Sequence, residues 1–287
     1  MNYSLEFFPP KDQESFKDFI DQARLLSIFS PQYMSITHTA NTVDNNLTME
    51  AVKILKKNLS VEIKPHMTCI NYSKSEIMEM TQDYLSLGVD SIVALRGNTK
   101  QSASNREPYY DNSLDFIKAL HAGFDIRVSI SGYPEAHPES RGVIADFIYL
   151  KEKSDAGADE IITQWCFSND LILRYRDLCY ARDIKIPISP GILPISDIKK
   201  VEYFAKLCGS SIPVEIEKAF LKIEGDDDAA EDLGVQFAIQ QIDDLLNEGI
   251  DNFHLYTLNR GDMTRKIIEH FEAPSRIKSV SSEMKAS

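Results

Sequence analysis

Short apolar runs alternate with amphipathic stretches along the whole chain. Residues 92–95 are consecutive apolar residues, which is typical of a strand that is covered on both faces. Gly88 precedes this run, where a helix is expected to end, and Arg96 follows it directly. The same order of glycine, aspartate and strand recurs after Gly157 and after Gly249. This recurrence predicts a helix–strand unit that is used repeatedly.

The complete pattern predicts strands separated by helices from one end of the chain to the other. The expected strands are residues 3–8, 33–37, 63–69, 92–95, 127–131, 160–164, 184–188 and 252–256. Expected helices include residues 73–87 and 142–156, and a last helix covers 261–271. This order predicts a single parallel (β/α)8 TIM barrel over residues 1–273. An open doubly wound sheet is the alternative, but no GxGxxG motif follows the first strand.

Three polar segments fall outside this alternation. Residues 99–106 have no periodicity and predict a mobile loop over the barrel mouth. Residues 274–287 lack an apolar face and predict a disordered tail. The acidic run of residues 226–228 is interpreted as a solvated helix start, because carboxylates favour a helix N-terminus.

Composition narrows the class of protein. A chain of 287 residues with 43% hydrophobic residues suits one α/β barrel. The net charge of -13 disfavours nucleic acid as a partner, and no apolar run approaches the roughly 20 residues of a membrane helix. Cys69, Cys166, Cys179 and Cys208 form no CxxC pair, and no signal segment precedes the first strand. A cytoplasmic protein with reduced thiols is therefore predicted.

Polar side chains stand at the end of nearly every predicted strand. In a parallel barrel these carboxyl ends meet at one rim, where active sites lie. The rim set is Glu6, Thr37, His66, Arg96, Asn98, Tyr133, His137, Gln164, Tyr256, Asn259 and Arg260. Each could be an ordinary hydrogen-bonded rim residue, but a purely structural barrel gives no reason for the whole set.

Glu6 lies within Leu-Glu-Phe-Phe-Pro-Pro, among apolar and aromatic neighbours. Burial disfavours a carboxylate, so the pKa of Glu6 is expected to rise and the group becomes a candidate proton donor. The alternative is a glutamate on the solvent side of the strand.

Metal and nucleophile chemistry are weaker hypotheses. His66, Cys69, His137 and His254 could converge, but few carboxylates accompany them, so no metal is predicted. No Ser or Cys stands in a GxSxG elbow, which disfavours nucleophilic hydrolysis.

A dense polar segment runs from Tyr133 to Glu139 and is stiffened by two prolines. Asp146 and Lys153 follow on the next predicted helix, seven residues apart and therefore on one face. An aromatic ring, a cation and a carboxylate together suit a flat, charged cofactor with ribose and phosphate parts. A surface pair of Asp146 and Lys153 is the alternative.

Eight motifs together resemble the methylenetetrahydrofolate reductase family in its bacterial catalytic-domain form, from Tyr3 to Phe271. They are Leu-Glu-Phe-Phe-Pro-Pro, Pro-His-Met-Thr-Cys, Ala-Leu-Arg-Gly, Tyr-Pro-Glu-Ala-His-Pro-Glu, Asp-Ala-Gly-Ala-Asp, Ile-Thr-Gln, Pro-Gly-Ile-Leu-Pro and Tyr-Thr-Leu-Asn-Arg. The resemblance implies a flavoprotein in which NADH or NADPH reduces FAD, or less expectedly FMN. The flavin then reduces 5,10-methylenetetrahydrofolate to 5-methyltetrahydrofolate for one-carbon metabolism and methionine supply. A homo-oligomer is left open.

The resemblance also implies a role for each matching position. Glu6 is implied as the general acid that opens the methylene bridge to an iminium. Implied cofactor contacts are Thr37, His38, Ala40, His66, Arg96, Gly97, Asn98, Tyr133, His137, Asp146 and Lys153. Implied substrate contacts are Gln164 for pterin and nicotinamide, Phe204 for either substrate, and Arg260 for the distal part of the folate.

Five positions depart from the family pattern. Asn98 replaces an Asp beside the flavin and pterin, His38 a frequent Tyr, and Lys200 a common Gln. Tyr149 and Glu152 stand where Asn and Arg often contact the outer part of FAD. These changes bear on flavin potential, on pterin binding and on the choice between FAD and FMN.

Two other classes of function stay open. One is a related flavin barrel that oxidises an amine, similar to proline dehydrogenase, which would need no nicotinamide. The other is a non-catalytic subunit that binds flavin or folate. A flavin spectrum that NADH bleaches under anaerobic conditions would exclude the inert subunit.

Overall fold

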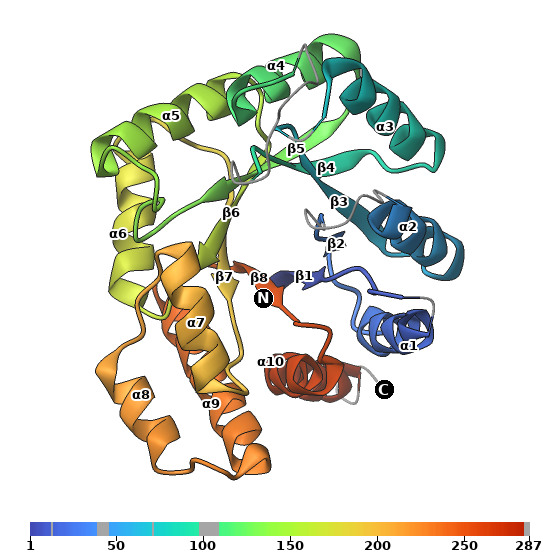
Figure 1. The fold of residues 1–287 in the computed structure, drawn as a ribbon. Coiled ribbons are helices and arrows are strands. Elements are labelled where there is room, and N and C mark those ends of the chain that lie inside the picture. The colour runs from blue at the N-terminus through green and yellow to red at the C-terminus, as the bar shows by residue number, and fades with distance from the viewer. Residues whose placement is uncertain (13, 39–45, 71, 98–108, 284–287) are drawn as a thin grey trace.

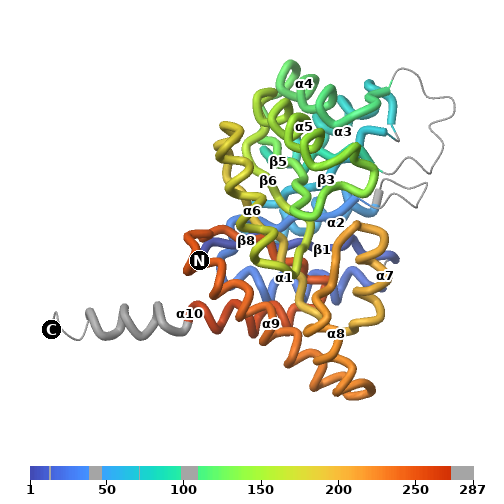
Figure 2. Tube along the Cα trace, turned by 90° about the vertical axis from the view of Figure 1, so that its left-hand side faces the viewer, coloured from blue at the N-terminus to red at the C-terminus, as the bar shows by residue number. Residues whose placement is uncertain are grey.

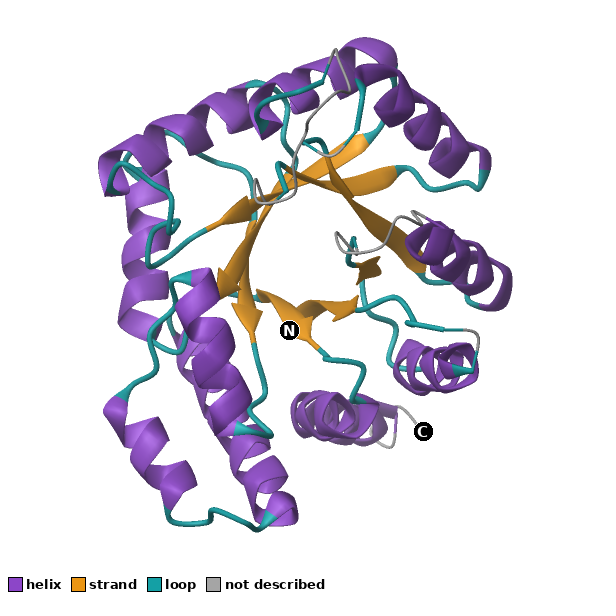
Figure 3. Ribbon diagram, in the orientation of Figure 1, coloured by secondary structure: helices purple, strands orange, loops and turns teal. Residues whose placement is uncertain are grey.

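A computed structural model describes residues 1–12, 14–38, 46–70, 72–97 and 109–283, and leaves out the side chains of Asn46 and of residues 273–283. Eight parallel strands form a closed barrel in the order β1-β2-β3-β4-β5-β6-β7-β8. Helices surround this barrel, as Figures 1 and 3 show. The predicted single (β/α)8 barrel is therefore confirmed. The predicted loop over residues 99–106 lies outside the described residues.

The strands match the predicted positions closely, with one exception discussed below. They are β1 Asn2–Phe7, β2 Tyr33–Ile36, β3 Glu62–Thr68, β4 Ser91–Leu95, β5 Arg127–Gly132, β6 Glu160–Trp165, β7 Ile188–Ile192 and β8 Asn252–Tyr256. The helices are α1 Ser15–Ser27, α2 Asn46–Asn58, α3 Lys74–Ser86, α4 Ser113–Gly123, α5 Val143–Asp155, α6 Asn169–Tyr180, α7 Ile198–Cys208, α8 Val214–Leu221, α9 Asp227–Asn247 and α10 Gly261–Glu283.

Side-chain caps fix where several helices begin. The Ser73 hydroxyl accepts from the backbone of Glu76, whose carboxylate accepts from the Ser73 backbone in return. At α9 the Asp226 carboxylate accepts from the Ala229 backbone N–H at 3.0 Å. The acidic run of residues 226–228 is thus a helix start, as predicted.

A buried ion pair crosses the interior of the barrel near the amino ends of its strands. Lys64 on β3 lies 3.0 Å from the Glu160 carboxylate at the start of β6, and its Nζ donates to Ser129 at 2.9 Å. The Tyr33 hydroxyl donates to the same carboxylate, and its ring lies 3.6 Å from Lys64 Nζ. Because β3 and β6 are not neighbours in the barrel, this cluster fills its interior. The opposite rim, at the carboxyl ends of the strands, therefore remains accessible for binding and catalysis.

The seventh strand is the exception, because it lies four residues beyond the predicted 184–188. The Ile184 N–H instead donates to the carbonyl of Cys179 and ends helix α6. Strand β7 spans Ile188–Ile192 and contains Pro190 and Gly191, two residue types that usually weaken or end a strand. A register shift on β6 between Ile162 and Trp165 admits this segment, and a side chain at Gly191 would overlap the carbonyl oxygen of Thr163.

Three helices stand between β7 and β8, where a regular barrel has one helix between successive strands. Figures 1 and 2 show α7, α8 and α9 together beside these strands. They enclose a second apolar cluster that includes Trp165, Ile195 and Phe220. This cluster extends the barrel wall at the carboxyl ends of β6 and β7.

The last helix, α10, continues to Glu283, past the predicted end at Phe271. The predicted disordered tail over residues 274–287 is not tested, because its side chains lie outside those that are described. Within the described residues, no helix is both long enough and apolar enough to cross a membrane.

We expect Gly234→Ala to destabilise the fold although alanine is the better helix former. A Cβ at this position of α9 would overlap the carbonyl oxygen of Ile195, a backbone atom that cannot rotate away. Overpacking of about 1–3 kcal/mol should exceed the helix-propensity gain of about 1 kcal/mol. Urea unfolding measures the difference. Gly123→Ala in α4 is the control, because a Cβ there meets open space; an equal gain for both variants would contradict the prediction.

Candidate active site

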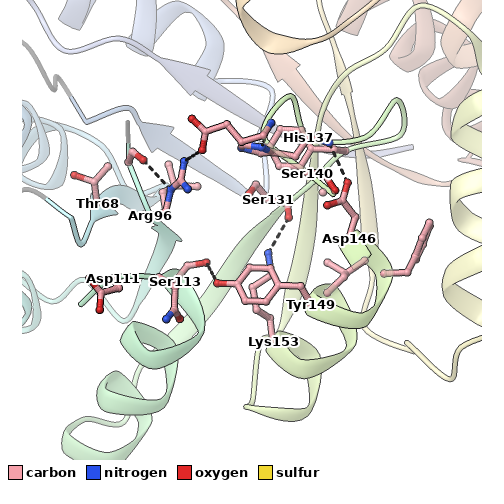
Figure 4. Close-up of a pocket in the computed structure, with 18 of the residues that line it drawn as sticks. Thr68, Arg96, Asp111, Ser113, Ser131, His137, Ser140, Asp146, Tyr149 and Lys153 are labelled. Carbon is pink, nitrogen blue, oxygen red and sulfur yellow. Dashed lines mark hydrogen bonds and ion pairs between the residues drawn. The ribbon is translucent and has the colours of Figure 1, made fainter. Parts of the chain in front are cut away.

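A cavity of about 500 Å³ opens at the carboxyl ends of β3, β4 and β5 and beside α5 (Figure 4). Most predicted cofactor positions line it, namely His38, Arg96, Gly97, Tyr133, His137, Asp146 and Lys153. The volume is within the usual range of a small-molecule site. Residues that are far apart in the sequence and were predicted to bind one cofactor thus line one cavity. The distances and hydrogen bonds between them could not be predicted.

Hydrogen bonds brace the loop after β5 over this cavity. The His137 backbone N–H donates to the Asp146 carboxylate at 3.0 Å, and the Glu139 N–H donates to His137 Nδ1 at 3.0 Å. Because Nδ1 accepts, a neutral His137 ring carries its hydrogen on Nε2. Burial and the Arg96 charge lower the pKa of His137. Arg96 pairs with Glu139 at 2.5 Å and ties β4 to the same loop.

Lys153 gives the cavity a buried cation. Its side chain is 6% exposed, and its Nζ makes a long contact of 3.4 Å with the Ser131 carbonyl, as Figure 4 shows. Burial lowers the pKa of Lys153 to about 8, against the attraction of the Asp146 carboxylate. The hydroxyl of Thr68, also buried in the wall, has no hydrogen-bond partner within the described residues. Lys153 and Thr68 can therefore still form contacts with a polar, anionic ligand. Because Lys153 is buried, it does not form the surface pair with Asp146 that was the alternative prediction.

Tyr149 closes the outer side of the cavity. Its hydroxyl lies 3.1 Å from the Ser113 hydroxyl and accepts from the Leu114 N–H at 3.1 Å, at the first turn of α4. Its ring centroid lies 5.0 Å from Lys153 Nζ. Glu152, the other unusual position on α5, is exposed and does not line the cavity.

Glu6 forms a second polar centre, inside the barrel at the end of β1. Its side chain is buried, with His254 Nε2 at 3.3 Å and His66 Nε2 at 3.4 Å from one carboxylate oxygen. The Ser4 hydroxyl lies 2.7 Å from His254 Nδ1, so His254 can accept from Ser4 and donate to Glu6. His66 Nε2 has no well-formed hydrogen bond within the described residues.

The expected direction of the Glu6 pKa shift is wrong in this structure. Burial does raise the pKa of Glu6, but the hydrogen bond from His254 and the attraction of the His66 and His254 imidazoles in their protonated forms lower it by more. The pKa therefore lies below its ordinary value of 4.5. Burial also lowers the pKa of His66, to about 4, which leaves its ring neutral near pH 7.

Four further predicted positions, which the structure describes, do not line the cavity. The Thr37 N–H donates to the Phe7 carbonyl at 2.9 Å, and Gln164 Oε1 accepts from the Trp165 N–H at 3.0 Å. Phe204 is 50% exposed on α7, and Arg260 forms an ion pair with Glu231 on α9. Ala40 and Asn98 lie outside the described residues.

Several cavity residues were not predicted from the sequence. They include Thr68, Asp111, Asn112, Ser113, Ser131 and Tyr175. Thr68 could have been found, because it stands two residues after His66 and side chains of a strand alternate between its two faces. His254 was considered only as a metal ligand. The described residues contain no group of three side chains arranged to hold a metal, and absence of a metal stays a prediction.

The fold and its rim define the class of protein as a TIM-barrel enzyme with a buried acid–imidazole centre and a cavity whose wall contains a buried lysine. The chain belongs to the methylenetetrahydrofolate reductase family, whose profile, described as Methylenetetrahydrofolate reductase, matches residues 1–272. It is thus an oxidoreductase of folate metabolism, and the family resemblance is confirmed.

Named relatives agree with this assignment. The 5,10-methylenetetrahydrofolate reductase of Escherichia coli is 36% identical over 267 residues, which is 93% of this chain and 89% of that protein. The enzyme of the same name from Pectobacterium carotovorum is 35% identical over the same shares. "Methylenetetrahydrofolate reductase (NADH) 1" of Arabidopsis thaliana is 32% identical over 90% of this chain and 46% of its own length.

Solved structures support the fold. An uncharacterized protein from Clostridium thermocellum, described as binding two copies of 5-methyl-5,6,7,8-tetrahydrofolic acid, has a TM-score of 0.61 at 18% identity. That match covers 93% of this chain and 92% of the other. A dihydropteroate synthetase has a TM-score of 0.53 at 11% identity, with coverage of 96% and 94%.

We expect acid to destabilise the protein from about pH 6.5 downward. Burial lowers the pKa of both His38 and His66 to about 4, so below their ordinary value of 6.5 the unfolded chain binds protons that the folded chain does not. The contribution of these two histidines to the free energy of unfolding is thus complete above pH 6.5. It is lost toward pH 4, by about 1–2 kcal/mol for each group at pH 5. Urea unfolding of wild type and His38→Gln at pH 7.5 and 5 tests this. Equal pH dependence in both proteins would exclude His38.

Proposed function

We propose that the chain reduces 5,10-methylenetetrahydrofolate to 5-methyltetrahydrofolate with a bound flavin, which NADH or NADPH reduces. The observation that carries the proposal is the pairing of two sites on one rim. One is the buried carboxyl of Glu6 with its two imidazoles, and the other is the cavity with the buried Lys153 cation. Family membership supports the folate reaction, and the cavity supports the flavin.

The cavity fits a flavin in three respects. Lys153 offers a cation with little pairing, and the buried Thr68 hydroxyl is without a partner in the described part of the chain. Gly97 has φ +90°, which residues with a side chain rarely adopt, and an added Cβ would make a tight contact of 3.1 Å with Thr68, so the cavity wall here is bare backbone. When bound, a flavin supplies two-electron transfer between nicotinamide and folate.

The residues around the cavity bind and orient in this proposal. Lys153 pairs with a phosphate of the cofactor, since a charge-assisted bond is about twice as strong as a neutral one. Asp146 holds the His137 loop, and the Arg96–Glu139 pair fixes that loop to β4. The Tyr149 hydroxyl accepts from the Leu114 N–H in the first turn of α4, so the outer cofactor is bound differently from relatives with Asn there. FAD is proposed, with FMN the alternative that this change keeps open.

Glu6 supplies the proton in this proposal. Its carboxyl protonates the amine nitrogen of the methylene bridge, the adjacent C–N bond breaks, and an iminium forms that accepts hydride at the methylene carbon. The Glu6 carboxyl must first be protonated, which its present contact with His254 opposes. A flat substrate over the rim would exclude water and strengthen the effect of burial, which raises the pKa.

Glu6→Gln should separate the two half-reactions. The amide keeps the shape but has no acidic proton, so flavin binding and reduction by NADH should persist while reduction of methylenetetrahydrofolate falls roughly 10²–10⁴-fold. Stopped-flow absorbance of the flavin measures both steps, and Glu6→Asp, which retains a carboxylic acid, should recover part of the loss. A folate half-reaction at the wild-type rate in Glu6→Gln would remove Glu6 from the mechanism.

Lys153→Met should weaken flavin binding by roughly 10–100-fold, the loss of one charge-assisted contact. Lys151→Met is a matched control on the same helix, because Lys151 pairs with Asp155 and does not line the cavity. Quenching of FAD and of FMN fluorescence on titration gives both affinities. If the two variants bind flavin equally, Lys153 does not contact the cofactor.

A further inference from the structure

The turn after β8 has an uncommon backbone. Leu258 has φ 50° and Asn259 has φ 57°, so two successive residues other than glycine are left-handed. Such conformations persist only where the surroundings hold them, and they gather at functional sites. The turn lies at the rim between the acid Glu6 and Arg260, so its contacts show what it is built to hold.

The Asn259 side chain clamps the backbone that follows β1. Its Oδ1 accepts from the Phe8 N–H at 2.9 Å, and its Nδ2 donates to the Phe8 carbonyl at 2.9 Å. The backbone register between β1 and β8 ends at Glu6 and Tyr256, so the amide adds a further rung beyond the ladder. Pro9 and Pro10 come next and have no N–H to donate.

The same turn holds the backbone of Glu6 itself. The Thr257 N–H and the Thr257 hydroxyl both donate to the Glu6 carbonyl, at 3.2 and 2.6 Å. The Asn259 N–H in turn donates to that hydroxyl oxygen at 3.1 Å. Thr257 is buried, so this chain of bonds is shielded from water. Asn259 therefore acts on the Glu6 backbone by two routes. Its N–H binds the Thr257 hydroxyl, and its side-chain amide binds the Phe8 backbone.

Arg260 leaves the turn in a fixed direction. Its N–H donates to the Thr257 carbonyl at 2.8 Å, and its guanidinium meets Glu231 on α9. One short turn thus sets both the strand end that carries Glu6 and the position of Arg260, directly before the first residue of α10. A shift of the turn would displace both groups together.

We propose that Asn259 is a positioning residue that fixes the height of the Glu6 carboxyl and the place of Arg260 relative to each other. This inference rests on the proposed function, in which Glu6 gives the proton, and on the contact of Arg260 with the distal part of the folate that the family resemblance implies. Binding of the flavin is independent of Asn259, because the cavity residues stand on β3, β4, β5 and α5.

The test compares variants that alter the clamp but not the turn's backbone. Asn259→Gly keeps the left-handed conformation accessible and removes both bonds to Phe8. Asn259→Asp keeps the acceptor for the Phe8 N–H and loses the donor to the Phe8 carbonyl. Asp183→Gly is the matched control, because Asp183 is also left-handed, with φ 56°, but lies after α6 and away from the rim.

In Asn259→Gly we expect the folate half-reaction to slow by at least tenfold and KM for methylenetetrahydrofolate to rise several-fold. Reduction of the flavin by NADH should stay within twofold of wild type. Asn259→Asp should be intermediate, and Asp183→Gly should match wild type in both half-reactions. Equal loss in both half-reactions, or no loss in either, would show that Asn259 only supports the fold.

A second readout needs neither flavin nor folate. A ¹³C NMR titration follows the Glu6 carboxyl, assigned through Glu6→Gln, and its midpoint should move in Asn259→Gly and stay unchanged in Asp183→Gly. An unmoved midpoint in Asn259→Gly would overturn the positioning role. If wild type reduces no methylenetetrahydrofolate, the proposed function fails, while the titration still decides whether Asn259 positions Glu6.

Discussion

The ion pair between Lys64 and Glu160 is the constraint on which the rest of the barrel depends. It joins β3 to β6 across the interior, and breaking a buried pair typically costs about 3–5 kcal/mol. Further along the same strands stand His66 and Thr68 on β3 and Gln164 on β6. Because the pair fixes these strands relative to each other, it also fixes the spacing of their carboxyl ends. Because the ion pair fills the barrel near the amino ends of the strands, the rim at their carboxyl ends remains for binding and catalysis.

At that rim the chain separates two electrostatic tasks. Glu6 lies among imidazoles inside the barrel, whereas Lys153 and Arg96 stand at the wall of the cavity. The chain as a whole carries a charge of -13, and the cavity lining also contains Asp111, Glu139 and Asp146, so the two cations stand among carboxylates. In the proposed function this arrangement keeps the groups that hold the cofactor apart from the carboxyl that gives the proton.

Much of the fold follows from local pattern, and the errors have physical causes. Apolar runs located seven strands closely, and the bounds of β8 agree with the prediction. The predicted range of β7 lay too early because Pro190 and Gly191 suggest the end of a strand, whereas a register shift on β6 accommodates them. The pKa of Glu6 could not be derived, since its partner His254 lies 248 residues away and meets it only through the pairing of β1 with β8. Residues lining the cavity from α4 were missed for the same reason.

A family match fixes positions in the sequence but not the contacts made there. Lys153 is buried at the cavity wall, as a cofactor contact should be, yet its neighbour Tyr149 places a ring beside it and bonds to the first turn of α4. The helix N-terminus that could face a phosphate is thereby partly satisfied by a phenol. In the proposed function the outer part of the cofactor would therefore rely more on Lys153, a buried group whose pKa, lowered to about 8, is near physiological pH.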